Sequence, residues 1–175
     1  KDQEDIPYIL IRPTAVYGPR EKDLFLMFKL INRHLALGIN CGEQLLTFVH
    51  VDDLCDAILA ALTKGPCPAE YFVTDTHSYT PVELRDCIIS AIGKRPLKIN
   101  IPSYVIRIFA SLNELIGNFS GYYPALNNEK MAELCAKNWQ CDVENTKLNL
   151  QFRPKYDLCT GIAQTVNWYK ANNWL

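Results

Sequence analysis

The sequence lacks an excess of charge of either sign. It has 18 Lys and Arg residues against 19 Asp and Glu residues, for a formal net charge of −1, and the basic residues are scattered. Because nucleic-acid-binding domains carry a clustered basic surface, we expect no nucleic-acid partner. With 175 residues, of which 49% are hydrophobic, the chain is long enough for one globular domain with its own core, and we treat residues 1–175 as that single domain.

Long apolar runs and targeting signals are also missing. No stretch of about 18 consecutive apolar residues occurs, as a membrane-spanning helix would need. The opening KDQEDIPY has neither the hydrophobic region nor the cleavage site of a signal peptide. We therefore expect a soluble, cytoplasmic protein that has no membrane partner.

The seven cysteines include no CxxC pair and no spacing typical of a metal site. Their odd number argues against a complete disulfide framework and leaves at least one unpaired thiol. We therefore predict reduced thiols packed in the core, as in the cytosol, and no metal site.

Glycine-rich phosphate loops are absent from the sequence as well. The eight glycines never take the spacing GxGxxG or GxxxxGK. Such loops place backbone N–H groups around a phosphate at a helix N-terminus. The sequence therefore contains no cradle for the pyrophosphate of a dinucleotide.

What the sequence does contain is an alternation of short apolar strands and amphipathic helices. Strands are predicted at 9–11, 45–51, 70–75 and 97–102, and helices at about 23–34, 52–65, 81–92, 105–117 and from 158 on, with a shorter helix around 131–135. This order is typical of βαβ units, whose parallel strands are covered by helices on both faces. Because ligands bind at the C-terminal ends of parallel strands, RPTAVYGPR (12–20) is predicted to form the edge of a binding cleft.

The clearest local signal is the start of the helix at 81–92. Thr80 is suited to cap it, Pro81 to occupy its first position, Glu83 to complete a capping box, and Gly93 to end it. Further helix caps are predicted at Asp23, at Asp52 or Asp53, and at Asp157.

Four segments resemble a known family, the extended short-chain dehydrogenase/reductases, also called the NAD-dependent epimerase/dehydratase family. They are IRPTAVYGPR (11–20), TFVHVDDLCDAILAAL (47–62), YFVTDTHSYTPVELRDCIISAIG (71–93) and LQFRPKYDLCTGIAQTVNWYKANNWL (150–175). The resemblance implies an α/β fold: the C-terminal portion of an NAD(P)-binding Rossmann-type fold, with parallel strands and helices, plus a smaller, mostly helical substrate-binding subdomain. The glycine-rich N-terminal half of that fold would be absent.

The resemblance also implies which catalytic parts are missing. Family members carry a glycine-rich NAD(P) fingerprint and a Tyr-x-x-x-Lys pair ahead of the first segment. None of the nine tyrosines here has Lys four positions on, and the closest approach is Tyr8 with Arg12. We therefore expect the substrate-side part of a larger, homodimeric oxidoreductase, with no catalytic residue of its own. NAD or NADP would bind in the complete enzyme and not to this chain.

Individual positions follow from the same resemblance. Pro13 and Val16 would lie beside the cofactor, and the substrate would be contacted by Thr14, Ala15, Arg20, Leu46 and Thr47. His50 lies in an apolar strand, so we interpret it as a hydrogen-bonded core histidine and not as a catalytic base.

Two of these positions bear on the small-molecule substrate. Many members that act on nucleotide sugars have Asn where this chain has Ala15 and Arg where it has Leu46. The pattern is therefore similar to the 3β-hydroxysteroid dehydrogenase and dihydroflavonol reductase branch, which reduces less charged ketones. One alternative is a nucleotide-sugar epimerase or dehydratase in which Arg20 holds the diphosphate. A second alternative is a non-catalytic binding module on the same fold.

Overall fold

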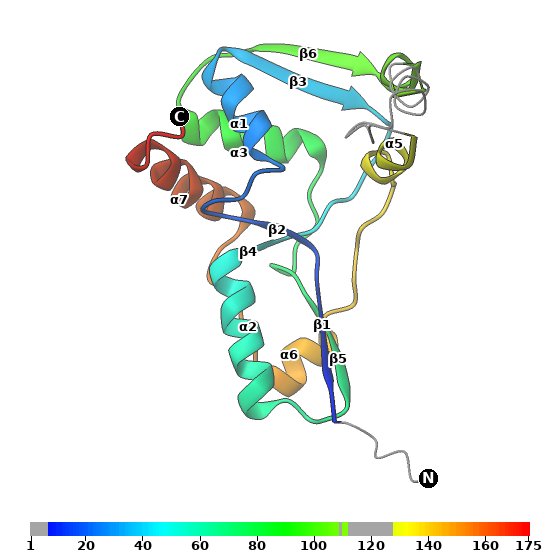
Figure 1. The fold of residues 1–175 in the computed structure, drawn as a ribbon, viewed down its shortest axis with the longest axis vertical. Helices are drawn as coiled ribbons and strands as arrows, with labels where there is room; N and C mark the ends of the chain where they lie inside the picture. The colour runs from blue at the N-terminus through cyan, green and yellow to red at the C-terminus, as the bar shows by residue number, and fades with distance from the viewer. Residues whose placement is uncertain (1–6, 109, 112–127) are drawn as a thin grey trace, which may run out of the picture.

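Pairs of parallel strands organise the fold, which a computed structural model describes for residues 7–108, 110–111 and 128–175. β1 (Ile9–Pro13) pairs with β5 (Ala69–Val73), β2 (Ala15–Tyr17) with β4 (Phe48–His50), and β3 (Leu35–Asn40) with β6 (Leu97–Pro102). All three pairs are parallel, as the alternation of strands and helices predicts. Figure 1 shows β1 and β5 in the lower half of the molecule and β3 and β6 at its top.

Helices cover these strands in two groups. α2 (Val51–Lys64) and α6 (Glu144–Leu150) lie beside β1 and β5, whereas α1 (Phe25–Asn32), α3 (Pro81–Ile92) and α7 (Leu158–Ala171) form the upper group (Figure 1). Each group has its own hydrophobic cluster of buried side chains, the lower one around Tyr71 and the upper one around Tyr17. In the upper cluster the Tyr17 ring lies against Gly161 of α7, where a Cβ atom would clash with it.

Two helix starts form as their sequences predict. In α3, the Thr80 hydroxyl accepts from the Glu83 N–H at 3.2 Å, and the Glu83 carboxylate accepts from the Thr80 N–H at 2.7 Å. α7 has the corresponding arrangement between Asp157 and Thr160. The structure therefore confirms both caps. They could be predicted because a capping box joins residues only three positions apart.

The predicted cap of α2 by Asp52 or Asp53 is wrong. The cap is His50, whose Nδ1 accepts from the Asp52 N–H at 3.3 Å while its Nε2–H donates to Gln164 at 3.0 Å. His50 is fully buried, so its interpretation as a hydrogen-bonded core histidine is confirmed. Asp53 is also fully buried, and its carboxylate accepts from the Lys155 and Tyr156 N–H groups at 2.9 and 3.1 Å.

The first predicted helix is too long at both ends. Asp23 does not cap it; the Glu21 carboxylate accepts from the Asp23 and Leu24 N–H groups instead. The helix ends at Asn32, and after a turn at His34, with φ of 63°, residues 35–40 form β3. Leu35 fits helical spacing in the sequence, but pairing with β6 overrides that local pattern.

The weakly patterned region is described only in part. The helix predicted at 105–117 is helical at 103–108 and 110–111, and the rest of it lies outside the described residues. The short predicted helix is α5 (Asn128–Leu134). β2, β3 and α6 were not predicted from the sequence.

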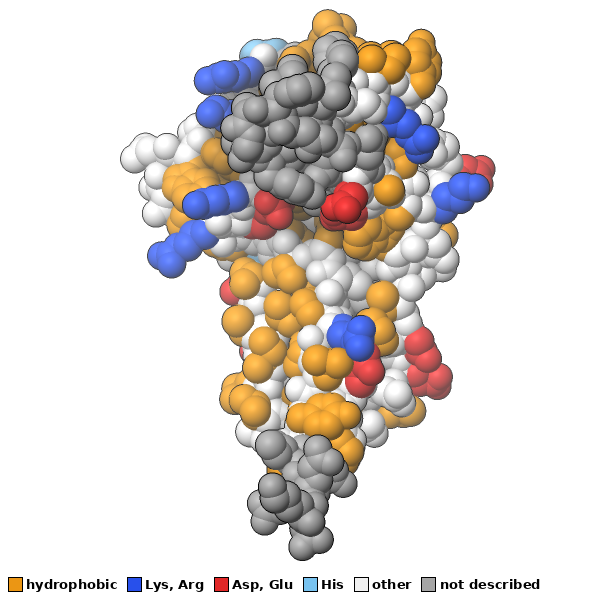
Figure 2. All heavy atoms as spheres, turned by 45° about the vertical axis from the view of Figure 1, so that its right-hand side comes forward, with side chains coloured by type: hydrophobic (Ala, Val, Ile, Leu, Met, Phe, Trp, Pro, Cys, Tyr) orange, Lys and Arg blue, Asp and Glu red, His pale blue; other side chains and the backbone are white. Residues whose placement is uncertain are grey.

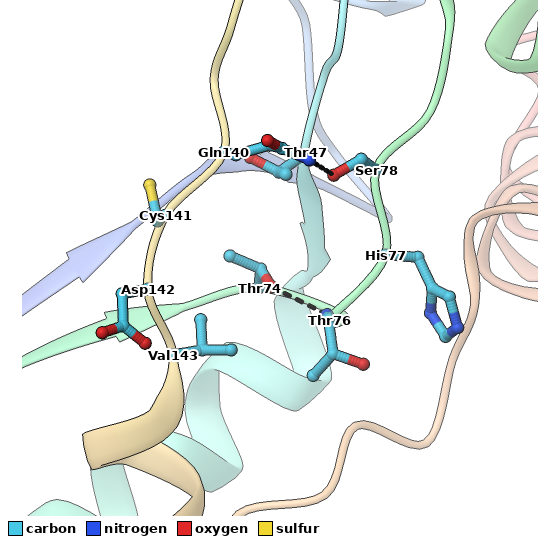
Figure 3. A pocket seen from close by; sticks show the side chains of 9 residues that line it. All are labelled: Thr47, Thr74, Thr76, His77, Ser78, Gln140, Cys141, Asp142 and Val143. Atoms are coloured by element: carbon cyan, nitrogen blue, oxygen red, sulfur yellow. Dashed lines mark hydrogen bonds between the residues drawn. The ribbon is translucent and has the colours of Figure 1, made fainter.

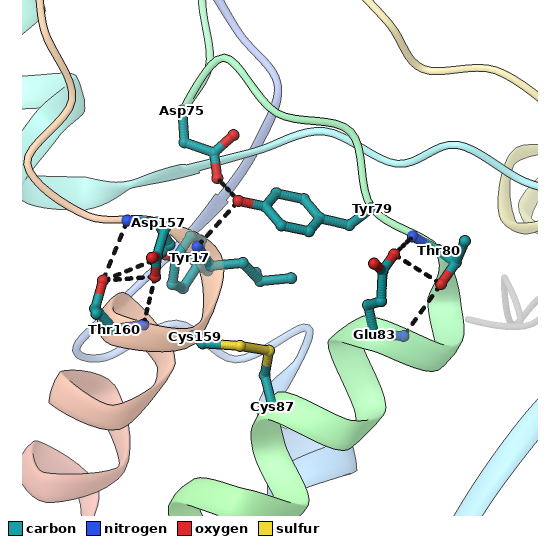
Figure 4. Close-up of a disulfide and its surroundings, with 10 residues drawn as sticks. Tyr17, Asp75, Tyr79, Thr80, Glu83, Cys87, Asp157, Cys159 and Thr160 are labelled. Carbon is teal, nitrogen blue, oxygen red and sulfur yellow. Dashed lines mark hydrogen bonds between the residues drawn. A yellow bond between two sulfur atoms is a disulfide. The ribbon is translucent and has the colours of Figure 1, made fainter.

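The prediction of reduced core thiols is wrong for four cysteines. Cys41 bonds to Cys135 and Cys87 to Cys159, with Cα–Cα distances of 5.2 and 5.1 Å. Figure 4 shows the second of these disulfides. The partners are 94 and 72 residues apart, so their sequence spacing could not reveal the pairing. The three free cysteines are not core residues either: Cys55 and Cys67 are exposed and Cys141 is half-buried. Disulfides are typical of oxidising compartments, and the cytoplasmic location stays a prediction.

Basic side chains are scattered over the surface, as they are along the sequence. On the face in Figure 2, Lys and Arg side chains are spread out, and hydrophobic side chains gather in the lower half. Exposed large hydrophobic residues of β1 and α2 include Leu10, Leu59 and Leu62. Among the helices of the described residues, none combines the length and the apolar character needed to cross a membrane.

Removal of the Asp53 carboxylate should lower the stability of the fold. Asp53→Ala removes a fully buried carboxylate that accepts from the Lys155 and Tyr156 N–H groups, so we expect it to lower the free energy of unfolding by about 2–4 kcal/mol. Asp56→Ala is the matched control, because Asp56 pairs with the Lys155 side chain at the surface and such pairs contribute about 0–1 kcal/mol. Urea unfolding measures both values, and equal losses in the two variants would contradict the assignment.

The Asp157 cap should depend on pH. Its hydrogen bonds with Thr160 hold the pKa of the Asp157 carboxyl below its ordinary value of 3.8, so its contribution is present above about pH 4 and is lost as the pH falls through the lower folded value. We expect Asp157→Ala to cost about 1 kcal/mol at pH 7. The thermal unfolding midpoints of the variant and the parent should become equal as the pH falls from about 4 to about 2, roughly the range of a lowered carboxyl pKa. A difference that stays constant over this range would argue against the cap.

Candidate functional site

The first candidate residues lie where β1 ends. Pro13 is the last residue of β1 and pairs with Val73, the last residue of β5. The next N–H, that of Thr14, donates to the Val73 carbonyl oxygen at 3.1 Å, and the Thr14 hydroxyl approaches the same oxygen at 3.4 Å. The two strands thus end side by side, at the edge where α/β sheets bind ligands.

The chain then changes partner strand. Ala15 lies opposite Phe48 and Val16 opposite Val49, so both belong to the β2–β4 pair. Ala15 is exposed and Val16 is half-buried. The candidate residues from Pro13 to Val16 therefore form a continuous run along one edge.

Leu46 and Thr47 approach this run from the segment before β4. Leu46 and Tyr79 exchange two backbone hydrogen bonds, of 2.7 and 2.8 Å. The Thr47 side chain is buried, and its hydroxyl donates to the Trp139 carbonyl oxygen at 2.6 Å. Trp139 in turn donates its N–H to the Leu45 carbonyl oxygen, so residues 45–47 hold the segment that follows α5.

Arg20 is placed differently. It lies beyond β2 with φ of 70°, and its guanidinium carbon is 6.0 Å from the centre of the Trp168 ring on α7. It does not line the pocket that Thr47 lines. The structure therefore brings Thr47 into a pocket and leaves Arg20 in a cation–π contact on the upper helices.

A pocket of about 370 Å³ opens beside Thr47 (Figure 3). Its lining comes from the end of β5 and the residues after it, and from the segment before α6. The residues are Thr47, Thr74, Thr76, His77, Ser78, Gln140, Cys141, Asp142 and Val143. Except for Thr47, sequence reasoning missed all of them. The polar run TDTHS (74–78) directly after a buried strand was a signal that could have found four of the nine lining residues.

A buried carboxylate lies behind the pocket wall. Asp75 accepts from the Tyr79 hydroxyl at 2.7 Å and from the His77 N–H at 3.0 Å, and the Tyr79 oxygen accepts from the Leu158 N–H at 3.2 Å (Figure 4). Burial raises the pKa of Asp75, partly offset by these hydrogen bonds. Asp75 thus holds residues 75–79 in shape and ties them to the start of α7.

The tyrosines near this edge are not suited to proton transfer. Burial raises the pKa of both Tyr17 and Tyr79 above the ordinary value of 10.0. The Tyr17 hydroxyl donates to the Asp157 carbonyl oxygen at 3.1 Å, and Tyr79 donates to Asp75. Burial also raises the pKa of the Cys141 thiol. A catalytic base or nucleophile needs its pKa lowered toward neutral pH, which is the opposite direction from these three shifts.

Among the described residues, the starts of six helices do not fit the pyrophosphate of a dinucleotide. Each of the helices α1, α2, α3, α5, α6 and α7 has a carboxylate at its start. These are Glu21, Asp52, Asp53, Glu83, Glu129, Glu144 and Asp157. A carboxylate there occupies or repels the position in which a phosphate would bind. We therefore derive no catalytic step through a cofactor from this chain. Among the described residues, no three His, Cys, Asp or Glu side chains gather as a metal site.

Known proteins of one family are similar to this chain. The model of the NAD dependent epimerase/dehydratase family matches residues 1–73. The chain is 24% identical to the ceramide reductase of Caulobacter vibrioides over 95% of this chain and 52% of that protein. It is 23% identical to the UDP-glucose 4-epimerase of Vibrio cholerae over 94% of this chain and 48% of that protein. The chain thus spans about half the length of the curated relatives it matches.

The fold comparison gives the same result. The UDP-glucose 4-epimerase of Thermotoga maritima, solved with UDP-glucose, superposes with a TM-score of 0.70 at 18% identity, covering 95% of this chain and 47% of that one. This likeness shows that the chain has the α/β fold of part of such Rossmann-type enzymes, as predicted. The family model and the relatives agree with this fold and make the chain similar to part of the NAD-dependent epimerase/dehydratase family.

Proposed function

We propose that this chain is the substrate-binding portion of an NAD(P)-dependent oxidoreductase that interconverts an alcohol and a ketone. The nicotinamide, bound mainly by the rest of the protein, would accept or supply the hydride. The observation that carries the proposal is the run from Pro13 to Val16 at the joint C-terminal edge of β1 and β5. In α/β folds this edge is where ligands bind.

The roles of the individual residues follow from their places in the run. Pro13 and Val16 present carbon surface and would flank the nicotinamide ring. Thr14, Ala15, Leu46 and Thr47 would form the wall for the substrate, with Thr14 and Thr47 as its hydroxyl groups. None of the four carries a charge, so this wall offers no counter-ion for a diphosphate.

Arg20 is the remaining candidate for holding an anion. Its contact with Trp168 leaves it outside the pocket beside Thr47. This placement supports a neutral alcohol or ketone as the substrate, in line with the reductase activity that the name of the Caulobacter vibrioides relative states. The proposed complete enzyme would be a homodimer that works in the cytoplasm.

A nucleotide-sugar epimerase or dehydratase is the second candidate. It is favoured by the relatives named UDP-glucose 4-epimerase and dTDP-glucose 4,6-dehydratase, which match this chain at 23% and 26% identity. In that case an anchor other than Leu46 and Ala15 would have to hold the diphosphate.

The substrate class can be tested with the longer protein. We expect kcat/KM for neutral ketones or secondary alcohols to exceed that for nucleotide sugars by at least tenfold, as one missing charge-assisted contact of about 1.5–3 kcal/mol implies. Arg20→Ala should leave this ratio unchanged, as should the control Arg12→Ala, whose side chain pairs with Glu70. A preference for nucleotide sugars that Arg20→Ala abolishes would instead support the second candidate.

The isolated chain should not hold the cofactor. Because carboxylates lie at its helix starts and no glycine-rich loop is present, we expect NADH to bind more weakly than about 1 mM. Isothermal titration calorimetry of the 175-residue chain with NADH measures this affinity. Binding in the micromolar range would show that this chain contains a nucleotide site of its own.

A further inference from the structure

The pocket beside Thr47 is lined mainly by hydroxyl and amide groups. Figure 3 shows Thr47, Thr74, Ser78 and Gln140 around one opening, with Thr76 at its lower side. Its volume of about 370 Å³ lies within the range of about 300–1,000 Å³ that small-molecule sites occupy.

These groups keep hydrogen-bonding capacity that the protein does not use. Thr74 accepts the Thr76 N–H at 2.7 Å, and Ser78 accepts a Gln140 side-chain N–H at 2.9 Å, so both hydroxyls can still donate. The Thr47 hydroxyl donates to Trp139, so its oxygen can still accept. A surface that offers hydrogen-bond donors and acceptors close together is complementary to hydroxyl groups, because each hydroxyl can both donate and accept.

The charges around the pocket disfavour anions. Among the described residues that line the pocket there is no Lys or Arg, and Asp142 supplies the one carboxylate. Asp142 accepts from the Glu144 N–H at 2.9 Å at the start of α6, and Figure 3 shows its carboxylate directed away from the centre. The His77 side chain also points away from the centre, and its Nδ1 lies 3.1 Å from the Asp75 carbonyl oxygen. A phosphate in the pocket would meet no cation.

Backbone strain marks the same wall. Thr76 has φ of 73°, a region that β-branched residues rarely adopt. The conformation persists because Thr74 holds the Thr76 N–H and Asp75 holds the His77 N–H. Glycine would adopt this backbone without strain, whereas Thr76 accepts the strain and places a hydroxyl-bearing side chain in the pocket lining.

We propose that this pocket binds an uncharged group that carries several hydroxyls, such as a sugar ring or cyclic polyol without phosphate. This inference rests on the proposed function, in which the same edge of the fold receives the substrate, and it assigns Thr74, Thr76, Ser78 and Gln140 to the polar part of that substrate. Val143 supplies an apolar surface for the carbon ring.

Nuclear magnetic resonance titration of the ¹⁵N-labelled chain tests the proposal with four probes. Myo-inositol and methyl glucoside should shift the amide signals of residues 74–78 and saturate at millimolar concentration. Cyclohexanol, a ring with one hydroxyl, should bind at least tenfold more weakly, and pyrophosphate should leave these signals unchanged. The proposal is overturned if pyrophosphate binds here as well as the polyols, or if the polyols cause no saturable shift because the pocket holds only water.

Two variants at one position separate binding from stability. Thr76→Val removes the hydroxyl and keeps the branched shape, and we expect about three- to tenfold weaker polyol binding. Thr76→Gly should weaken binding by a similar factor while it raises the unfolding midpoint by about 2–4 °C, because the strain is relieved. If Thr76→Val does not fold, Thr76→Gly still decides the question. Unchanged affinity in the folded variants would show that Thr76 has only a structural role.

A control variant and a binding measurement separate the pocket assignment from the proposed function. Thr63→Val removes a threonine hydroxyl that is exposed on α2 and bonds to the Leu59 carbonyl oxygen, so polyol affinity should not change. The titration needs neither cofactor nor turnover. A longer protein that transfers hydride while this chain ignores polyols would therefore overturn the pocket assignment alone, and polyol binding without hydride transfer would overturn the proposed function alone.

Discussion

The change of strand partner at Thr14 is the constraint on which the candidate site depends. Before this residue the chain is β1, hydrogen-bonded to β5, and after it the chain is β2, hydrogen-bonded to β4. The Thr14 N–H donates to the Val73 carbonyl oxygen, the last tie to β5. Because both pairs are parallel, the ends of β1 and β5 meet the beginning of β4 at one edge, and the residues that follow β5 line the pocket beside it.

Burial of a few polar groups keeps that edge in shape. Asp53 holds two N–H groups of the segment before α7, and Asp75 holds the Tyr79 hydroxyl, which in turn accepts from Leu158. Asp53 joins segments that are far apart in sequence directly, and Asp75 does so through the Tyr79 hydroxyl. The disulfide between Cys87 and Cys159 joins α3 to the same end of α7. The wall of the pocket is therefore supported from behind by a connected set of covalent and polar contacts.

The carboxylates at the helix starts disfavour phosphate binding at those positions. They stabilise the helices by interaction with the unpaired N–H groups and the positive end of the helix dipole. The same interaction is the one that a dinucleotide phosphate would use in a Rossmann-type fold. In the proposed function, other parts of the protein would therefore hold the cofactor phosphates, and this chain would offer the substrate an uncharged surface.

The sequence by itself determined the elements whose signals are local. The starts of α3 and α7 follow from Thr80 with Glu83 and from Asp157 with Thr160, because capping boxes join residues three positions apart. The edge at Pro13 to Val16 followed from an apolar strand that ends in turn residues. Tertiary structure alone decided β3, the His50 cap, both disulfides, the position of Arg20 over Trp168, and the meeting of residues 74–78 with 140–143. The physical reason is that each of these depends on a partner far away in the chain, whose place is set by packing and strand pairing and leaves no periodic mark in the sequence.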